Sequence, residues 1–341
     1  MQARDTRGRA DLRKALRHYF YTGDQIAFRS IIADAIQWPG GARPVLYEAY
    51  SQALSGDPHW KVDRLPGLVK AIDVQLDAVD RAVMAFCFGD VGEALRAINE
   101  APVTGRHRQR FLLWRAFLEN KSALDAGAYA SEAPLNIFQF WDKAPPRDVE
   151  AAMDEWRDFV GPSSYARFDD ASAREVLVDA GIPGLLDAYD SARHPAMKSD
   201  IFRLVYLLRN GGLYVDADTR PAPAARNVLG AASRSLHLAF YAHQPHGLLQ
   251  NAVMLVEPGH PLLPLAIETC IKNVLGGEVE RVSIATGPGV VTNAFLTLLE
   301  KGAIPATMMA FSECNTRLAR NFPASYKGDD RSWHLAARRE A

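Results

Sequence analysis

The chain has 341 residues, which is enough to bury a large core, so two domains are the starting expectation. Its 39 lysines and arginines nearly cancel its 40 aspartates and glutamates, and the net charge of −1 does not indicate a nucleic-acid-binding surface. The three cysteines, Cys87, Cys270 and Cys314, lack C-x-x-C spacing, which excludes a predicted disulfide framework or zinc site.

The N-terminal end is rich in arginine but is not followed by the apolar run of a signal peptide. We also expect no segment with the length of a membrane span. These features predict a cytoplasmic protein. The basic end could touch an anionic surface at the inner face of the membrane, although a solvated tail is the favoured interpretation.

Residues 1–130 are predicted to form an all-helical domain. Periodic apolar segments, among them 79–88, 91–98 and 108–118, are separated by short linkers that contain proline or glycine, as in stacked helical hairpins. The turn at 88–95 resembles those of tetratricopeptide-like arrays, but no repeat with a fixed period is found, so a plain helical domain is favoured. A protein partner of this domain stays open.

The pattern changes near residue 131, where short strands begin to alternate with helices. Strands are predicted at 135–141, 165–170, 213–218, 236–241 and 252–256, and helices at 149–159, 171–180, 184–189, 197–210, 263–275 and from 286 onward. This alternation predicts an α/β domain over 131–341, with a mostly parallel central sheet and ligands at the carboxyl ends of its strands.

One stretch of this domain, residues 197–221, combines a helix, a glycine turn and a strand. Apolar residues at Ile201, Leu204, Val205 and Leu208 have the spacing of one buried helix face. Ser199 or Asp200 could cap the start of the helix. The pair Gly211-Gly212 is expected to end it.

The strand that follows places two carboxylates on one face. Its alternation puts Tyr214, Asp216 and Asp218 on the side opposite its apolar residues. Like charges at this spacing repel, so a shared cation explains them better than water does, and hard oxygen ligands favour magnesium or manganese. Asp200 and Arg203, three residues apart on the helix, would complete a small polar site.

Two further signals are weaker. The glycine-rich turn 286–292 could present backbone N–H groups to an anion, but a structural helix start is the favoured interpretation. His243 and His246 have no accompanying carboxylate, so we do not predict a metal site there.

With these residues assembled, the region from Leu135 onward resembles glycosyltransferase family 32, whose members share an Asp-X-Asp motif, and more distantly the catalytic domain of the large clostridial glucosylating toxins. The central match is Lys198-Ser199-Asp200-Ile201-Phe202-Arg203 followed by Gly211-Gly212-Leu213-Tyr214-Val215-Asp216-Ala217-Asp218. Further matches are Phe140-Trp141, Asn251-Ala252-Val253-Met254, Pro258-Gly259-His260-Pro261, Thr286-Gly287-Pro288 and Ser332-Trp333.

The resemblance implies a GT-A fold, a nucleoside-diphosphate sugar (UDP- or GDP-linked) as donor, a divalent cation (Mn2+ or Mg2+) and retention of anomeric configuration. It implies catalytic roles for Asp200, Arg203, Asp216 and Asp218, with Asp216 and Asp218 binding ribose and metal. It further implies that the donor is contacted by Phe140, Trp141, Tyr214, Asn251, Ser332 and Trp333, of which the last two would close over the diphosphate. The approach to Ser332 departs from the family pattern, because it reads Lys327-Gly328-Asp329-Asp330-Arg331 where relatives have histidines and aromatic residues.

Together with these residues, the resemblance implies a metal-dependent retaining glycosyltransferase. A metal at Asp218 would stabilise the departing diphosphate, and Arg331 or Lys327 could assist. Because no carboxylate stands out as a nucleophile, we expect same-face transfer in which the leaving phosphate accepts the acceptor's proton. The acceptor could be a glycan, a lipid-linked saccharide or a protein, with polysaccharide assembly as the expected setting. A nucleotide-sugar hydrolase and an inactive, transferase-like interaction protein are the alternatives.

Overall fold

A computed structural model describes residues 78–87, 90–100, 108–125, 136–231, 236–241, 248–277, 279, 281–302 and 306–328. The chain divides into two compact units, Met1–Glu119 with Ala242–Gly247, and Asn120–Tyr241 with Leu248–Ala341. The predicted domain boundary at 130/131 lies outside the described residues and stays a prediction.

The described helices of the N-terminal region are α5 (Ala78–Cys87), α6 (Val91–Asn99) and α7 (Arg108–Asp125), which confirms the three helices predicted there. Asp90 caps α6, since its carboxylate accepts a hydrogen bond of 2.8 Å from the Glu93 N–H. Phe86, Trp114 and Phe117 pack edge to face, with ring centroids 5.3 to 6.3 Å apart. Residues before 78 are not among those described, so the choice between a repeat and a plain helical domain stays open.

The second unit is built on a six-stranded sheet with the order β2-β1-β3-β6-β5-β7. The strands are β1 (Ile137–Phe140), β2 (Tyr165–Phe168), β3 (Gly212–Val215), β5 (Leu236–Tyr241), β6 (Leu248–Val256) and β7 (Ala306–Ala310). The neighbours β1 and β2, β1 and β3, and β5 and β7 pair in parallel. Among the strands that the structure describes, β6 is the one that runs antiparallel to both of its neighbours. The predicted α/β class and mostly parallel sheet are confirmed.

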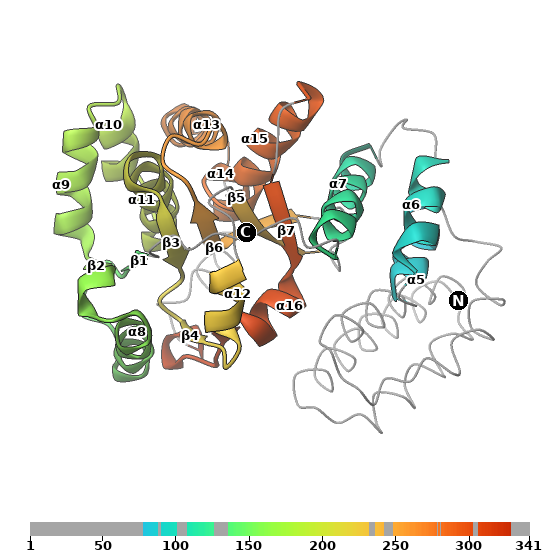
Figure 1. The fold of residues 1–341 in the computed structure, drawn as a ribbon. Helices are drawn as coiled ribbons and strands as arrows, with labels where there is room; N and C mark the ends of the chain where they lie inside the picture. Colours follow the sequence, from blue (N-terminus) through green and yellow to red (C-terminus); the bar gives the residue numbers. More distant parts are fainter. Residues whose placement is uncertain are drawn as a thin grey trace, which may run out of the picture. The chain divides into compact units, whose positions relative to one another are not determined.

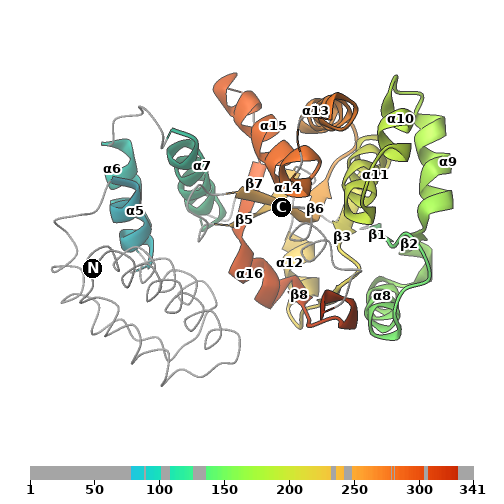
Figure 2. The same ribbon diagram turned by 180° about the vertical axis from the view of Figure 1, so that it is seen from behind.

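Helices cover both faces of this sheet (Figures 1 and 2). They are α8 (Arg147–Val160), α9 (Asp170–Ala180), α10 (Leu185–Asp190), α11 (Pro195–Asn210), α12 (Ala225–Ala231), α13 (Leu262–Gly276), α14 (Val282–Ala285), α15 (Pro288–Glu300) and α16 (Phe311–Arg317). Ile137, Leu213 and Val215 pack in one core cluster with residues of α8, α12 and α16. Phe138 and Tyr214, one residue out of phase, face the other side, where Phe138 contacts Phe202 of α11.

The described part of the second unit also contains a small second sheet and short 3-10 helices. The strand β4 (Thr219–Pro221) pairs antiparallel with β8 (Ala319–Asn321) as a separate two-stranded sheet. Among the described residues, the 3-10 helices are η3 (Pro162–Ser164), between α8 and β2, and η4 (Ser325–Gly328). The pairing of β4 with β8 brings η4 back toward the end of β3, a contact between distant parts of the sequence that local patterns did not predict.

The helix α11 begins earlier than predicted. His194 is its N-cap, with Nδ1 accepting from the Ala196 N–H at 3.3 Å, and Pro195 occupies the first turn. The prediction that Ser199 or Asp200 caps the helix is therefore wrong. Both residues lie inside the helix and are buried, because their side chains serve tertiary contacts instead.

Two glycines connect α11 to β3 where no other residue fits. Both have positive φ, 64° at Gly211 and 106° at Gly212. A Cβ at Gly211 would lie 2.6 Å from Pro258 Cδ, and one at Gly212 would lie 2.6 Å from the Asn136 carbonyl oxygen. The strand that follows is shorter than predicted, because the Thr219 N–H donates to the Asp216 carbonyl and turns the chain after Val215.

One stretch among the described residues, Val282–Glu300, is long and apolar enough to cross a membrane by length and composition, whereas no such segment was expected from the sequence. Half of this apolar segment is buried in the structure, and Thr286 and Gly287 separate it into α14 and α15. Residues of α15 such as Val290, Val291 and Phe295 are almost fully buried. A core helix explains this composition.

Candidate active site

The Asp-X-Asp segment lies directly after β3, at the carboxyl end of the parallel strands. The Asp216 N–H donates to the Ala252 carbonyl of neighbouring β6 at 2.9 Å, which fixes the first aspartate to the sheet. Figure 1 shows α11 running alongside β3, so the polar residues of the helix and the strand end can meet. Carboxyl ends of parallel strands are the usual ligand-binding edge of such sheets.

Arg203 of α11 is the centre of a buried polar network. Only 4% of the residue is exposed. Its guanidinium donates to the Ser199 carbonyl (3.1 Å), the Ser199 hydroxyl (2.8 Å) and the Asn251 carbonyl (2.6 Å). It also pairs with Asp200 at 3.1 Å and Asp216 at 3.2 Å, and stacks 4.1 Å from the Tyr214 ring centroid. This single cation therefore joins the helix, the central strand and β6.

Asp200 is held on both of its oxygens. Oδ1 accepts from the Asn251 amide at 2.8 Å, and Oδ2 accepts from the Thr286 hydroxyl at 2.9 Å. A Cβ at Gly287 would lie 3.3 Å from Oδ2, so this glycine lets the backbone before α15 approach the carboxylate. Burial raises the pKa of Asp200, and the charge of Arg203 opposes that shift.

Asp216 lies at the edge of this network. Its Oδ1 accepts from the Tyr214 hydroxyl at 2.9 Å, while 34% of its side chain is exposed. Its carbonyl accepts from the Thr219 hydroxyl (2.7 Å) and the Gln139 amide (3.3 Å). Burial raises the pKa of Asp216 to about 6, opposed by Arg203 and increased by the nearby Asp218 carboxylate. Its exposed face leaves it open to a cation, which would favour the charged form.

Asp218 is covered by side chains from η4. Its Oδ2 accepts from the Tyr326 hydroxyl at 2.8 Å and lies 2.6 Å from the Lys327 ammonium. Only 13% of the Asp218 side chain is exposed. The Tyr326 ring packs edge to face against Trp141, with centroids 5.0 Å apart. Burial raises the pKa of Tyr326, and the Asp218 charge adds to this, so the phenol stays a hydrogen-bond donor.

The two aspartates fit a magnesium or manganese ion. Asp216 uses Oδ1 and Asp218 uses Oδ2 in the bonds above, so each retains a second oxygen without a hydrogen-bond partner in the described part of the chain. No group of three or more His, Cys, Asp or Glu side chains that could hold a metal occurs among the described residues. Magnesium commonly binds through one or two carboxylates together with water and substrate phosphates. These aspartates would therefore hold the ion jointly with a donor.

The structure separates the predicted site residues into two groups. The first group is buried and, through Arg203 and Tyr214, contacts Asp216 from inside the protein. It contains Asp200, Arg203, Tyr214 and Asn251. Asp216, Asp218 and Trp141 are partly exposed and can meet a ligand. Phe140 is 4% exposed and packs against Phe202, so the structure places it in the core. Ser332 and Trp333, like His243 and His246, lie outside the described residues.

Three contributors were missed by sequence reasoning. Thr286 was noted within a helix start or anion-binding turn and as part of a match to the family, but the bond from its hydroxyl to Asp200 was not predicted. Gln139 and Tyr326 were not predicted to take part, yet they hold the Asp216 carbonyl and the Asp218 carboxylate. Each comes from a distant strand or loop, and no local spacing could have signalled it.

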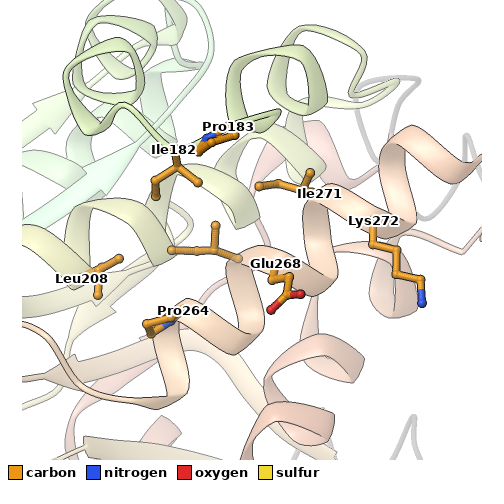
Figure 3. A pocket seen from close by; sticks show the side chains of 8 residues that line it. Ile182, Pro183, Leu208, Pro264, Glu268, Ile271 and Lys272 are labelled. Carbon is orange, nitrogen blue, oxygen red and sulfur yellow. The ribbon is translucent and has the colours of Figure 1, made fainter.

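A hollow of about 500 Å³ elsewhere on the second unit is separate from this site (Figure 3). It is lined by Ile182, Pro183, Leu208, Pro264, Ile267, Glu268, Ile271 and Lys272. None of these is a predicted site residue. Its mostly apolar lining contains no aspartate pair, so we assign no donor to it.

Comparison with known proteins links the chemistry of this site to a family. Residues 146–236 match the family described as "Glycosyltransferase sugar-binding region containing DXD motif". This range contains Asp200, Arg203, Asp216 and Asp218, and the match confirms the resemblance to Asp-X-Asp sugar transferases.

Two curated relatives come from Schizosaccharomyces pombe. The chain is 24% identical to "Initiation-specific alpha-1,6-mannosyltransferase" over 199 residues, 50% of each protein. It is 24% identical to "Inositol phosphoceramide mannosyltransferase 2" over 214 residues, 59% of this chain and 58% of the relative. The chain thus spans between half and three-fifths of the length of these relatives.

Two solved structures are also similar to the chain. "PaToxG Glycosyltransferase" is 16% identical, with a TM-score of 0.39 over 57% of this chain and 80% of that one. The "UDP-bound glycosyltransferase domain from the YGT toxin" is 10% identical, with a TM-score of 0.32 over 85% of this chain and 73% of that one.

Proposed function

We propose that this chain, which carries the sugar-binding region of the Asp-X-Asp glycosyltransferases, moves a sugar from a nucleoside diphosphate to an acceptor with the help of a divalent cation. One observation carries the proposal. Asp216 and Asp218 sit together at the carboxyl end of β3, each with one oxygen fixed by protein donors. A pair of carboxylates held in this way suits a cation that also binds the donor's diphosphate.

The cation would supply Lewis-acid stabilisation of the charge that grows on the leaving diphosphate. The chain's own residues keep the site in place for that event. Arg203 fixes Asp216 through an ion pair and holds Tyr214 under it by stacking. A polar site whose dipoles and charges are oriented before reaction requires little reorganisation in the transition state. We therefore assign Arg203 the role of a positioning residue.

The environment of Asp200 argues against a covalent glycosyl intermediate on this carboxylate. A nucleophilic carboxylate needs a free oxygen facing the sugar, but both Asp200 oxygens accept hydrogen bonds and one also pairs with Arg203. Asp200 is moreover only 6% exposed. For the retention of anomeric configuration that the resemblance implies, we propose same-face transfer, in which the acceptor oxygen bonds to the sugar as the sugar–phosphate bond breaks, and the leaving phosphate oxygen takes the acceptor's proton.

The donor and acceptor classes are proposals of the same kind. Both curated relatives are named as mannosyltransferases, which supports mannose as the first donor sugar to test, on UDP and on GDP. One of them is named for a lipid, so lipid-linked acceptors are proposed alongside glycans and proteins. A cytoplasmic location, contact of the N-terminal end with a membrane, and a protein partner of the helical region also stay predictions.

A thermal-shift panel tests the proposal directly. UDP, GDP and their sugars are titrated with and without manganese, and ligand binding to the native protein is expected to raise the melting temperature. Asp218→Asn should abolish the manganese-dependent part of the shift, whereas Asp179→Asn on the exposed face of α9 should leave it intact. No nucleotide-dependent shift with any of these ligands would favour an inactive, transferase-like interaction protein.

Turnover distinguishes transfer from hydrolysis. Incubation with donor alone measures release of free sugar, and addition of saccharide or lipid-linked acceptors measures transfer. We expect acceptors to accelerate donor consumption. Rapid donor cleavage that no acceptor changes would instead support a nucleotide-sugar hydrolase.

A further inference from the structure

The segment that covers Asp218 is fixed to the rest of the second unit. We call residues 322–327 the strap. The Ser325 N–H and hydroxyl both donate to the Asp148 carboxylate at the start of α8, at 2.6 and 2.9 Å. Ala324 is 4% exposed and belongs to a small core cluster with Val149 and Ala217. The strap is thus built against the Asp-X-Asp turn by packing as well as by hydrogen bonds.

At the end of the strap, Lys327 brings a positive charge onto a predicted metal ligand. Its ammonium lies 2.6 Å from Asp218 Oδ2 and donates to the Phe322 carbonyl at 3.3 Å. The Lys327 side chain is 39% exposed, so one side of the ammonium faces solvent. The Lys327 ammonium, held by these two oxygens, therefore lies beside the Asp-X-Asp segment, where the proposed diphosphate would bind.

The two cations of the site differ in their freedom to move. Arg203 bonds, pairs or stacks with five residues, and its side chain is only 5% exposed. Lys327 ends in a compact charge on a flexible stem and has an open side. A divalent cation on Asp218 would repel the ammonium at this distance. Lys327 can move away from that repulsion, whereas Arg203 cannot.

We propose that Lys327 is a mobile cation of the donor site, which pairs with Asp218 when no metal is bound and with the donor's diphosphate when a metal takes Asp218. This inference rests on the proposed function, since it requires a diphosphate donor. It makes Lys327 a diphosphate-binding residue and a competitor of the metal.

The proposal predicts opposite changes in two affinities. In Lys327→Met, which has a similar length and no charge, Mn2+ alone should bind more tightly because its competitor is gone. UDP or GDP in the presence of saturating Mn2+ should bind more weakly because a diphosphate partner is gone. We expect about fivefold in each direction, the effect of a partly exposed ion pair. A residue that only stabilised the strap would weaken both.

The experiment measures Mn2+ binding by electron paramagnetic resonance and nucleotide binding by calorimetry. Lys327→Arg should retain nucleotide affinity near that of the unchanged chain. Lys301→Met, at an exposed site after α15, is the matched control and should change neither affinity. Lys327→Gln provides a second neutral variant if the methionine variant is poorly folded by circular dichroism.

The outcomes separate this inference from the proposed function. If the unchanged chain binds neither Mn2+ nor any nucleoside diphosphate, the proposed function fails. If the unchanged chain binds both, but the neutral variants leave Mn2+ affinity equal or lower, the competition is refuted. If Mn2+ affinity rises while nucleotide affinity is unchanged, the diphosphate contact is refuted.

Discussion

Replacement of Arg203 tests whether the residue that orders the site also stabilises the fold. The guanidinium makes three hydrogen bonds and two ion pairs in a nearly water-free place. Arg203→Met keeps much of the stem but removes the charge, and leaves Asp200 and Asp216 without their main cation. Arg203→Lys keeps the charge but cannot reproduce the planar set of donors.

The magnitude follows from that burial. Removal of one partner from a buried ion pair costs about 3–5 kcal/mol, because the remaining charge is left uncompensated. We expect Arg203→Met to lie in that range. For Arg203→Lys we expect about 2–4 kcal/mol, since an ammonium can satisfy one or two of the acceptors, and hydrogen bonds to charged groups contribute about 1.5–3 kcal/mol each.

Equilibrium unfolding in urea, followed by circular dichroism, measures this free energy of unfolding. Arg209→Lys, on an exposed part of the same helix, is the matched control and should cost less than about 0.5 kcal/mol. A loss below about 1 kcal/mol for Arg203→Met would refute the reasoning, because it would mean that the network contributes little to the fold.

Further results are expected at Asp216, Thr286 and Gly287. The pKa of Asp216 is raised from 3.8 to about 6, so the folded protein binds the Asp216 proton more tightly than the unfolded chain does. Without metal, protonated Asp216 therefore contributes to the stability of the fold fully below pH 3.8, and this contribution is lost as the pH rises through 6. Because metal binds the carboxylate, nucleotide-dependent Mn2+ affinity should instead fall by up to about tenfold per pH unit below 6, and a flat binding profile between pH 5 and 7.5 would contradict this assignment. Thr286→Val should cost about 1–3 kcal/mol in urea unfolding, since it leaves Asp200 Oδ2 without its neutral donor, and Thr286→Ser should restore most of that stability. Gly287→Ala, whose Cβ would press on the same carboxylate, should lower the melting temperature, whereas Gly276→Ala, with open space around it, should not.

The parts of the site that lie close together in sequence were predictable. The buried face of α11, the Gly-Gly turn and the paired aspartates are local signals, each visible within one or two helical turns. The structure confirms the helix end at Gly211 and the common side of Tyr214 and Asp216. These patterns depend on backbone geometry, which neighbouring residues largely determine.

The remaining parts depend on tertiary contacts. Asp200 was predicted as a helix cap because aspartate favours that position. The helix begins earlier, and the Asp200 carboxylate instead accepts hydrogen bonds from the distant residues Asn251 and Thr286. The strand β3 was predicted to reach residue 218, but bonds from Thr219 and Gln139 to one carbonyl turn the chain earlier. The antiparallel direction of β6 likewise follows from pairing between distant strands.

The buried network under the Asp-X-Asp turn has a consequence for redesign. In a library of variants at Arg203, Tyr214 or Asn251, most members would fold poorly. Few folded variants would remain in which a change of donor preference could be measured. Partly exposed positions at the rim of the site, such as Trp141 and Lys327, contribute less to the stability of the fold. Diversity confined to the rim would let donor preference be altered while the scaffold beneath it is left intact.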